Sequence, residues 1–371
     1  MSSDKVTYIL GAGASCKSQP LVFDMKDRML ALLELLNPKS NLHNDYILPE
    51  LKGKTMRIYN KYNKVIQESV KHHTPDTYAK KLHLTRQKDN LELFKEFLNL
   101  YFLFEQDFSK DAYSSFPENP YKIEPKIIGL GEDKRIDLKN ESETRDTLLM
   151  DRTKGEKTWK SIETPIDYRY DVFYATLLEA FGNDRLTLPS NVNILSWNYD
   201  NQLELAYKDY ENMDMNSIKS QLNINPKTYD EYKSHIVKLN GTCNLMHRDE
   251  DDEVKELDFI KAIQLLKEDT SLQNEIEFAW ESKSKNWGVI NSIILKTNKL
   301  VIIGYSFPNF NKDIDTLILH YLPKGNCQIF IQVPEDEEYT RIKERILQRG
   351  ILLKSEKIVH KKDRDQFFIP I

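Results

Sequence analysis

Cysteine is scarce in this chain of 371 residues. The three cysteines, Cys16, Cys243 and Cys327, are far apart in the sequence and odd in number. A disulfide framework needs cysteines in pairs, and a four-cysteine zinc site needs one more than the chain contains. The sequence therefore excludes both within one chain, and we expect neither zinc nor another bound metal.

Long apolar runs and an excess of positive charge are also missing. No stretch approaches the roughly 18 consecutive apolar residues of a membrane-spanning helix. The N-terminal segment MSSDKVTYIL lacks the apolar core of a signal peptide. The net charge is -5, so no overall basic character marks a nucleic-acid-binding protein. These absences predict a cytoplasmic protein with neither a membrane nor a nucleic acid as its partner.

What the sequence does contain is a series of short apolar runs, separated by stretches with helical periodicity. The runs, which we predict to be strands, are Val6–Leu10, Val192–Ser196, Ile236–Leu239, Leu300–Ile303, Cys327–Val333 and Lys357–His360. The predicted helices are Ser15–Leu36, Asn90–Phe108, Tyr170–Phe181, Gln202–Tyr210, Lys255–Leu266, Asn274–Leu295 and Glu337–Gln348. Strands that are apolar on both faces are typical of a parallel sheet covered by helices. We therefore predict an α/β protein with a Rossmann-like, doubly wound, mostly parallel sheet.

The gap between the first predicted helix and the second predicted strand is far longer than one βα unit requires. It contains the amphipathic stretch Asn90–Phe108 and a polar segment, residues 118–157, with few large apolar residues. We interpret residues 39–165 as a large helical insertion with a flexible polar segment. Residues 1–38 and 166–371 then form the Rossmann-like domain.

A glycine-rich loop follows the first predicted strand, and its sequence is Gly11-Ala12-Gly13-Ala14-Ser15. Gly11 permits a sharp turn, and Gly13 lets the backbone approach a pyrophosphate without a Cβ in the way. We expect the following N–H groups and the start of a helix to face the anion, with Ser15 as helix cap or phosphate donor. The alternative is a tight strand–helix turn without a ligand, because Cys16 replaces the third glycine of the dinucleotide fingerprint.

Polar or small residues directly follow three further predicted strands. The segments are Leu195-Ser196-Trp197-Asn198-Tyr199-Asp200, Val237-Lys238-Leu239-Asn240-Gly241-Thr242 and Val301-Ile302-Ile303-Gly304-Tyr305-Ser306-Phe307-Pro308. Ligands of open α/β sheets bind at the carboxyl ends of the strands, so we expect these segments to share one site with the glycine-rich loop. Asn198 and Asp200 have a second interpretation, as caps and loop contacts for the predicted helix Gln202–Tyr210.

Taken in order, the four segments resemble those of the sirtuin-like proteins of bacterial anti-phage defence, a divergent branch of the sirtuin family. That branch carries Gly-Ala-Gly-x-Ser, Asn-Tyr-Asp, Lys-Leu-His-Gly and Gly-Tyr-Ser-Phe motifs and a helical insertion after the first helix. The resemblance implies an NAD site in which the residues from Gly11 to Ser15 bind the pyrophosphate. It also implies that Gly304 and Ser306 close over the adenosine side, and that Asn198 and Asp200 lie by the nicotinamide ribose.

The activity that the resemblance implies is hydrolysis of NAD to nicotinamide and ADP-ribose, within a homo-oligomer or with a partner ATPase. The four-cysteine zinc module of the deacetylase sirtuins is missing, so we do not expect protein deacetylation. The catalytic histidine of Lys-Leu-His-Gly is replaced by Asn240, and an amide cannot act as a general base near neutral pH.

Two main functions therefore stay open, with a plain scaffold as a third. One is an NAD hydrolase in which Asn198, Asp200 and Asn240 position and stabilise the reacting ribose. The other is a catalytically impaired sensor or assembly module that binds NAD or ADP-ribose. Under either of these two, Gly13→Val is predicted to abolish ligand binding while leaving the sheet intact and the melting temperature nearly unchanged.

Overall fold

The computed structural model describes residues 4–19, 21–22, 25–40, 53–107, 166–181, 185–248, 254–268, 270, 272–281, 286–323, 326–350 and 357–370. The chain divides into two compact units. Unit 1 comprises residues 1–16, 166–242 and 277–371, and unit 2 comprises residues 17–165 and 243–276. The polar segment predicted to be flexible lies outside the described residues.

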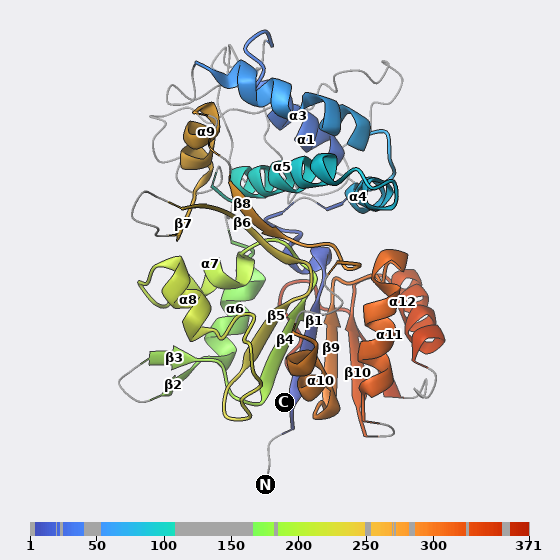
Figure 1. The fold of residues 1–371 in the computed structure, drawn as a ribbon. Coiled ribbons are helices and arrows are strands. Elements are labelled where there is room, and N and C mark those ends of the chain that lie inside the picture. The colour runs from blue at the N-terminus through green and yellow to red at the C-terminus, as the bar shows by residue number, and fades with distance from the viewer. Residues whose placement is uncertain are drawn as a thin grey trace, which may run out of the picture. The chain divides into compact units, whose positions relative to one another are not determined.

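Unit 1 is built on a six-stranded parallel sheet (Figure 1). Its strands are β1 Val6–Leu10, β4 Val192–Ser196, β5 His235–Lys238, β9 Lys299–Ile303, β10 Gln328–Gln332 and β11 Ile358–Lys361. The order across the sheet is β11-β10-β9-β1-β4-β5, so the first strand is central and the later strands add on either side of it. This order is consistent with a Rossmann-like fold. The predicted α/β class and all six predicted strands are confirmed.

Both faces of the sheet are buried. Since successive side chains of a strand point to opposite faces, neighbouring residues belong to different cores. Ile9 belongs to a core shared with three helices, α10 Trp287–Leu295, α11 Lys312–Tyr321 and α12 Asp336–Arg349. Tyr8 belongs to a second core, shared with α6 Tyr168–Leu177, α7 Gln202–Lys208 and α8 Met215–Gln221. Burial on both sides explains why the strands are apolar along their whole length.

Several elements differ from the predicted ones. The predicted helix Ser15–Leu36 is a short 3₁₀ helix, η1 Ala12–Ser15, and a separate helix, α1 Met25–Leu35. Gln19 precedes a proline in the sequence, and a proline disfavours helical backbone at the residue before it. Short strands occupy parts of three other predicted helices, namely β2 Glu179–Phe181 (paired with β3 Arg185–Thr187), β7 Val254–Glu256 and β8 Gln273–Ile276. These segments form strands because they pair with neighbouring strands, and the periodicity of the local sequence gives no information on such pairing.

Unit 2 contains five described helices and part of a second sheet. The helices are α1, α3 Thr55–Ser69, α4 Pro75–Leu84, α5 Lys88–Asp107 and α9 Phe259–Lys267. The sheet has the order β7-β6-β8, and β6 Gly241–Arg248 begins in unit 1. The boundaries differ from the predicted residues 39–165, because α1 packs on α3, and α9 packs on α3 and α5. The predicted helix Asn90–Phe108 is confirmed as α5.

Candidate functional site

The glycine-rich loop after β1 and the loop after β9 cross each other with their backbones in contact. The N–H groups of Gly11 and Gly13 donate to the carbonyl oxygens of Ile303 and Gly304, both at 3.0 Å. A Cβ on Gly11 would lie 2.6 Å from the Gly304 oxygen, and one on Gly13 would lie 2.8 Å from the Gly304 Cα. Gly304 has a left-handed φ of 59°, and its Cβ would lie 2.3 Å from the Gly13 carbonyl carbon. All three glycines are therefore required by the packing of one loop on the other.

This crossing corrects the predicted effect of Gly13→Val. The variant was expected to leave the sheet intact, but even one added carbon atom at Gly13 meets the backbone of Gly304. Backbone cannot move aside as a flexible side chain can, so the substitution strains the fold as well as any ligand site. We therefore expect Gly13→Val to lower the melting temperature, contrary to the expectation from the sequence.

The hydrogen bonds of the loop also differ from the predicted cradle. The N–H groups of Gly11 and Gly13 bond within the protein, and the Ala14 N–H donates to the Gly11 oxygen at 2.8 Å. Gly11, not Ser15, is the N-cap of η1, and no α-helix begins at the loop. Ala12 is the exposed residue of the loop.

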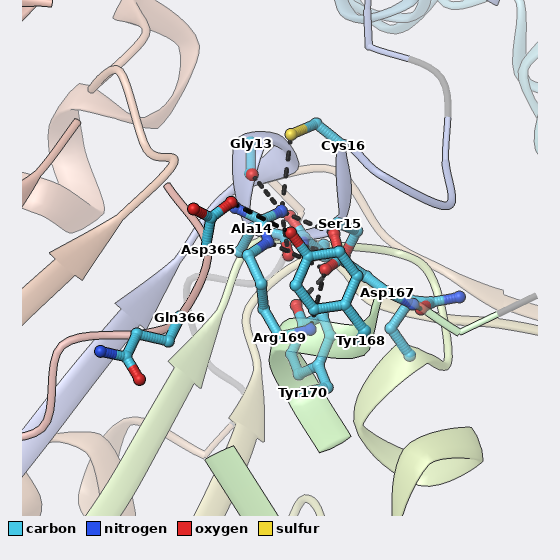
Figure 2. A network of polar contacts seen from close by, with 12 residues as sticks. Gly13, Ala14, Ser15, Cys16, Asp167, Tyr168, Arg169, Tyr170, Asp365 and Gln366 are labelled. Atoms are coloured by element: carbon cyan, nitrogen blue, oxygen red, sulfur yellow. Dashed lines mark hydrogen bonds and ion pairs between the residues drawn. The ribbon is translucent and has the colours of Figure 1, made fainter. Parts of the chain in front are cut away.

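Ser15 connects the glycine-rich loop to the end of β4. Its hydroxyl is buried, accepts a hydrogen bond from Asn198 Nδ2 at 3.1 Å and lies 3.1 Å from the hydroxyl of Tyr170 on α6 (Figure 2). It also hydrogen-bonds the carboxylate of Asp200. A hydroxyl donates once and accepts twice, and a carboxylate only accepts. Ser15 is therefore surrounded by Asn198, Asp200 and Tyr170, and either hydroxyl can donate in its contact with Tyr170.

Asp200 is a buried carboxyl group at the start of α7. Its Oδ1 accepts the N–H of Gln202, the first residue of α7, at 3.1 Å. The N-cap of α7 is Asn201, however, and not Asp200 as the capping interpretation expected. Burial raises the pKa of Asp200, and the positive charge of Lys238 opposes that shift. Lys238 Nζ donates to the backbone oxygen of Asp200 at 2.7 Å and to the buried carboxylate of Glu204 at 3.2 Å. Asp200 thus combines a structural contact with a carboxyl group whose charge is poorly solvated.

Asn240 lies at the end of β5 with one of its two polar atoms engaged. Its Nδ2 donates to the carbonyl oxygen of Trp197 at 3.1 Å. Its Oδ1 is buried and has no hydrogen-bond partner among the residues that the structure describes. The ring of Trp197 stacks on Tyr305 from the loop after β9, with centroids 5.7 Å apart. The Oδ1 of Asn240 is therefore an available acceptor. The hydrogen bond from Asn240 to Trp197 and the stacking of Trp197 on Tyr305 connect the end of β5 to the segments that follow β4 and β9.

The loop after β9 is held by residues of α11 and α12 that the sequence did not single out. Arg345 donates to the carbonyl oxygen of Ser306 at 2.5 Å. Arg349 forms a buried ion pair with Asp315, whose carboxylate also accepts the Tyr305 hydroxyl at 2.9 Å. Burial raises the pKa of Asp315, and Arg349 opposes that shift. The predicted ligand residue Ser306 is thus held through its backbone, with its side chain half-buried.

Sequence reasoning also missed Asp167 and Arg169 at the start of α6. Arg169 donates to the carbonyl oxygens of Gly13 and Ala14, at 3.1 Å each, and forms an ion pair with Asp167 (Figure 2). Asp167 is the N-cap of α6 and accepts the N–H of Arg169 at 3.1 Å. An aspartate before a helix is a recognisable capping signal. No local signal, however, indicates that Arg169 reaches a loop more than 150 residues earlier.

The site thus brings Ser15, Asn198, Asp200 and Asn240 to the carboxyl ends of β1, β4 and β5, and Gly304 and Ser306 to that of β9. Its side chains supply amides, a hydroxyl and a buried carboxyl group with a raised pKa. Such a set can orient a ligand through hydrogen bonds, and its carboxyl group can stabilise positive charge or take up a proton.

No protein-family model and no curated protein sequence matches this chain. Within the described ranges, no helix has the length and apolar character needed to cross a membrane. The same ranges contain no group of three or more His, Cys, Asp or Glu side chains arranged to bind a metal ion.

Proposed function

We propose that this chain is a sirtuin-like protein that binds NAD or an ADP-ribose-containing nucleotide and hydrolyses NAD to nicotinamide and ADP-ribose. The observation that carries the proposal is the strand order. From β1 the chain continues to β4 and β5 on one side of it and then to β9, β10 and β11 on the other, so the order reverses direction between β1 and β9. Dinucleotides of α/β proteins bind at this switch point, outside the carboxyl ends of the strands. Each of the four motif segments follows the carboxyl end of a strand of this sheet. The segments after β1 and β9 contact each other there through Gly13 and Gly304.

The proposal includes the finer features of the fold and the setting. The sheet is a doubly wound Rossmann-like sheet, and residues 39–165 belong to a large helical insertion. The protein acts in the cytoplasm in anti-phage defence, as a homo-oligomer or with a partner ATPase. The defence role and the partners come from the resemblance of the four motifs to the sirtuin-like defence proteins, and the other features come from the sequence pattern.

In the proposed reaction, Asp200 and Asn198 act on the ribose. Breaking the nicotinamide–ribose bond develops positive charge on the sugar, and nicotinamide leaves as a neutral molecule. A buried carboxylate with a raised pKa is stabilised by such a charge more than a solvated one, because little water competes for it. Asn198 is held by Ser15 through its Nδ2, which leaves its Oδ1 to accept a ribose hydroxyl. Carboxylates have comparable roles in glycoside hydrolysis.

The second candidate is a sensor or assembly module that binds NAD or ADP-ribose without cleaving it. Asn240 favours this candidate, because it replaces the histidine of the family motif. Its Nδ2 is engaged by the Trp197 carbonyl oxygen, and an amide oxygen cannot take a proton from a ribose hydroxyl at neutral pH.

Incubation of the purified chain with NAD, followed by separation of nicotinamide and ADP-ribose, tests the hydrolase. Calorimetric titration with NAD and with ADP-ribose tests binding separately. Release of nicotinamide that is lost in Asp200→Asn and kept in Asp209→Asn, an exposed carboxyl group after the same helix, supports the hydrolase. Binding without release supports the sensor, and the absence of both contradicts the proposal.

A further inference from the structure

The start of α6 contacts the glycine-rich loop on the side of its carbonyl oxygens (Figure 2). Arg169 Nη2 shares one N–H between the oxygens of Gly13 and Ala14, at 3.1 Å each, since its other N–H donates to Asp167. In a trans peptide group the N–H points away from the C=O. By binding both oxygens, Arg169 fixes the direction of two consecutive peptide groups. The N–H that belongs with the Ala14 carbonyl, that of Ser15, is therefore turned away from α6.

Arg169 is itself held on two further sides. Asp167 accepts its Nε at 2.8 Å and its Nη2 at 2.6 Å, and the two side chains are only 9% and 0% exposed. The guanidinium carbon lies 5.2 Å from the centre of the Phe367 ring, near the C-terminus. A guanidinium group held by a carboxylate and a ring has a fixed plane. Since Asp167 neutralises it, Arg169 contributes orientation to the loop and adds no net charge.

The same contacts reach the carboxyl group proposed to act on the ribose. The Asp167 N–H donates to Gln202 Oε1 at 2.8 Å, and the Gln202 N–H donates to Asp200 Oδ1 at 3.1 Å. A continuous chain of buried hydrogen bonds thus connects Asp200, through Gln202, Asp167 and Arg169, to the glycine-rich loop. A displacement of Arg169 therefore disturbs both the loop and Asp200.

We propose that Arg169 is a positioning residue of the nucleotide site, which holds the glycine-rich loop in the peptide orientation that the ligand needs. The ring of Phe367 packs against the guanidinium group of Arg169 and helps to fix its plane. Phe367 therefore contributes, through Arg169, to the conformation of the loop. The ligand part of this inference rests on the proposed function, whereas the order of the loop does not. A lysine keeps the charge but lacks the planar fork that bridges two carbonyl oxygens and a carboxylate.

The test compares Arg169→Lys with Arg28→Lys in the full chain. Arg28 lies on α1 of unit 2 and forms an equally buried forked pair with Glu105, with side chains 11% and 2% exposed. Amide hydrogen exchange of residues 11–16 is measured by mass spectrometry, and the Kd for ADP-ribose and for NAD by calorimetry. We expect loop exchange about 10-fold faster and Kd about 10-fold weaker in Arg169→Lys, the scale of one lost charge-assisted hydrogen bond. If NAD is cleaved, KM should rise by a similar factor while kcat changes by less.

The control Arg28→Lys should lower the melting temperature similarly and leave loop exchange and Kd unchanged. Unchanged loop exchange in Arg169→Lys overturns the proposal whether or not a nucleotide binds. Faster exchange with an unchanged Kd also overturns the positioning role. If the unaltered chain binds neither nucleotide, the proposed function fails, and the exchange result alone decides whether Arg169 holds the loop. If Arg169→Lys does not fold, Phe367→Leu, which keeps every polar contact, should show the same changes at about 3-fold.

Discussion

A methyl group added at Gly304 meets backbone atoms at shorter distances than one added at Gly11 or Gly13. Its φ of 59° lies in the left-handed region, and an alanine Cβ would lie 2.3 Å from both the Ala14 nitrogen and the Gly13 carbonyl carbon. Gly304→Ala therefore combines a strained backbone conformation with a contact that only a shift of one loop relieves.

The expected loss of stability is the sum of these two effects. A left-handed conformation costs a residue with a Cβ about 1–2 kcal/mol, and forcing an extra carbon into packed surroundings costs about 1–3 kcal/mol. The total, about 2–5 kcal/mol, corresponds to a melting temperature lowered by about 4–20 °C in a domain of 150–250 residues. Gly13→Ala lacks the left-handed contribution and meets Gly304 at 2.8 Å, so its loss should be smaller.

Thermal melting followed by circular dichroism measures the effect, with Gly288→Ala as the control. Gly288 lies in α10, and nothing lies within 4 Å of a Cβ added there. Alanine has the higher helix propensity, so this variant should melt at the same temperature as the unaltered chain or slightly above it. A melting temperature for Gly304→Ala within about 2 °C of the unaltered chain would refute the glycine crossing as a requirement of the fold.

Four further outcomes are expected. Asn198→Ala should lower NAD turnover by about 10²-fold and change ligand affinity by much less, as measured by nicotinamide release and calorimetry. Asp200→Asn should lower turnover as well, and unchanged turnover would limit Asp200 to its contact with α7. Asn240→His should raise turnover by about 10²–10⁴-fold if the protein is a hydrolase, whereas a sensor should still release no nicotinamide. His235 is buried, its Nε2 accepts the Asp230 N–H at 3.0 Å, and burial lowers its pKa to about 4. Because the unfolded chain takes up this proton near pH 6.5, stability should fall from pH 6.5 towards 4, and melting of His235→Gln against pH should lack this component.

The strands of the sheet could be predicted from the sequence because each is a short, continuous apolar run. Each is apolar on both faces, so a strand such as Val192–Ser196 needs no knowledge of its neighbours to be recognised. The ends of the strands could also be predicted, because polar residues directly follow the apolar runs. Asn198, Asp200 and Asn240 follow β4 and β5 as expected. The order of the strands, by contrast, depends on pairing between residues up to about 300 positions apart and is not written in any local pattern.

The glycine-rich loop was harder to predict, because its motif has two physical explanations. A glycine is expected both where the backbone approaches a pyrophosphate and where it packs on another backbone, as Gly13 does on Gly304. The motif alone does not contain Gly304. The predicted helix Ser15–Leu36 failed for a related reason. Its apolar residues have helical spacing, but most of them serve α1 in unit 2, whereas η1 belongs to unit 1.

The variant Asn240→His is chosen to keep the hydrogen bond to Trp197 while changing the chemistry of the side chain. Its Nδ2 donates to the Trp197 oxygen, so its Oδ1 is the remaining acceptor. A neutral imidazole that donates through Nδ1–H to the same oxygen would leave the lone pair of Nε2 as its remaining acceptor. The two side chains then differ chiefly in that the imidazole, with an ordinary pKa of about 6.5, can take up a proton near neutral pH. A gain of turnover on Asn240→His would therefore show that the rest of the site is competent and lacks only a base. If ligand binding is kept and no nicotinamide is released, the fault lies instead in how Asn198 and Asp200 frame the ribose.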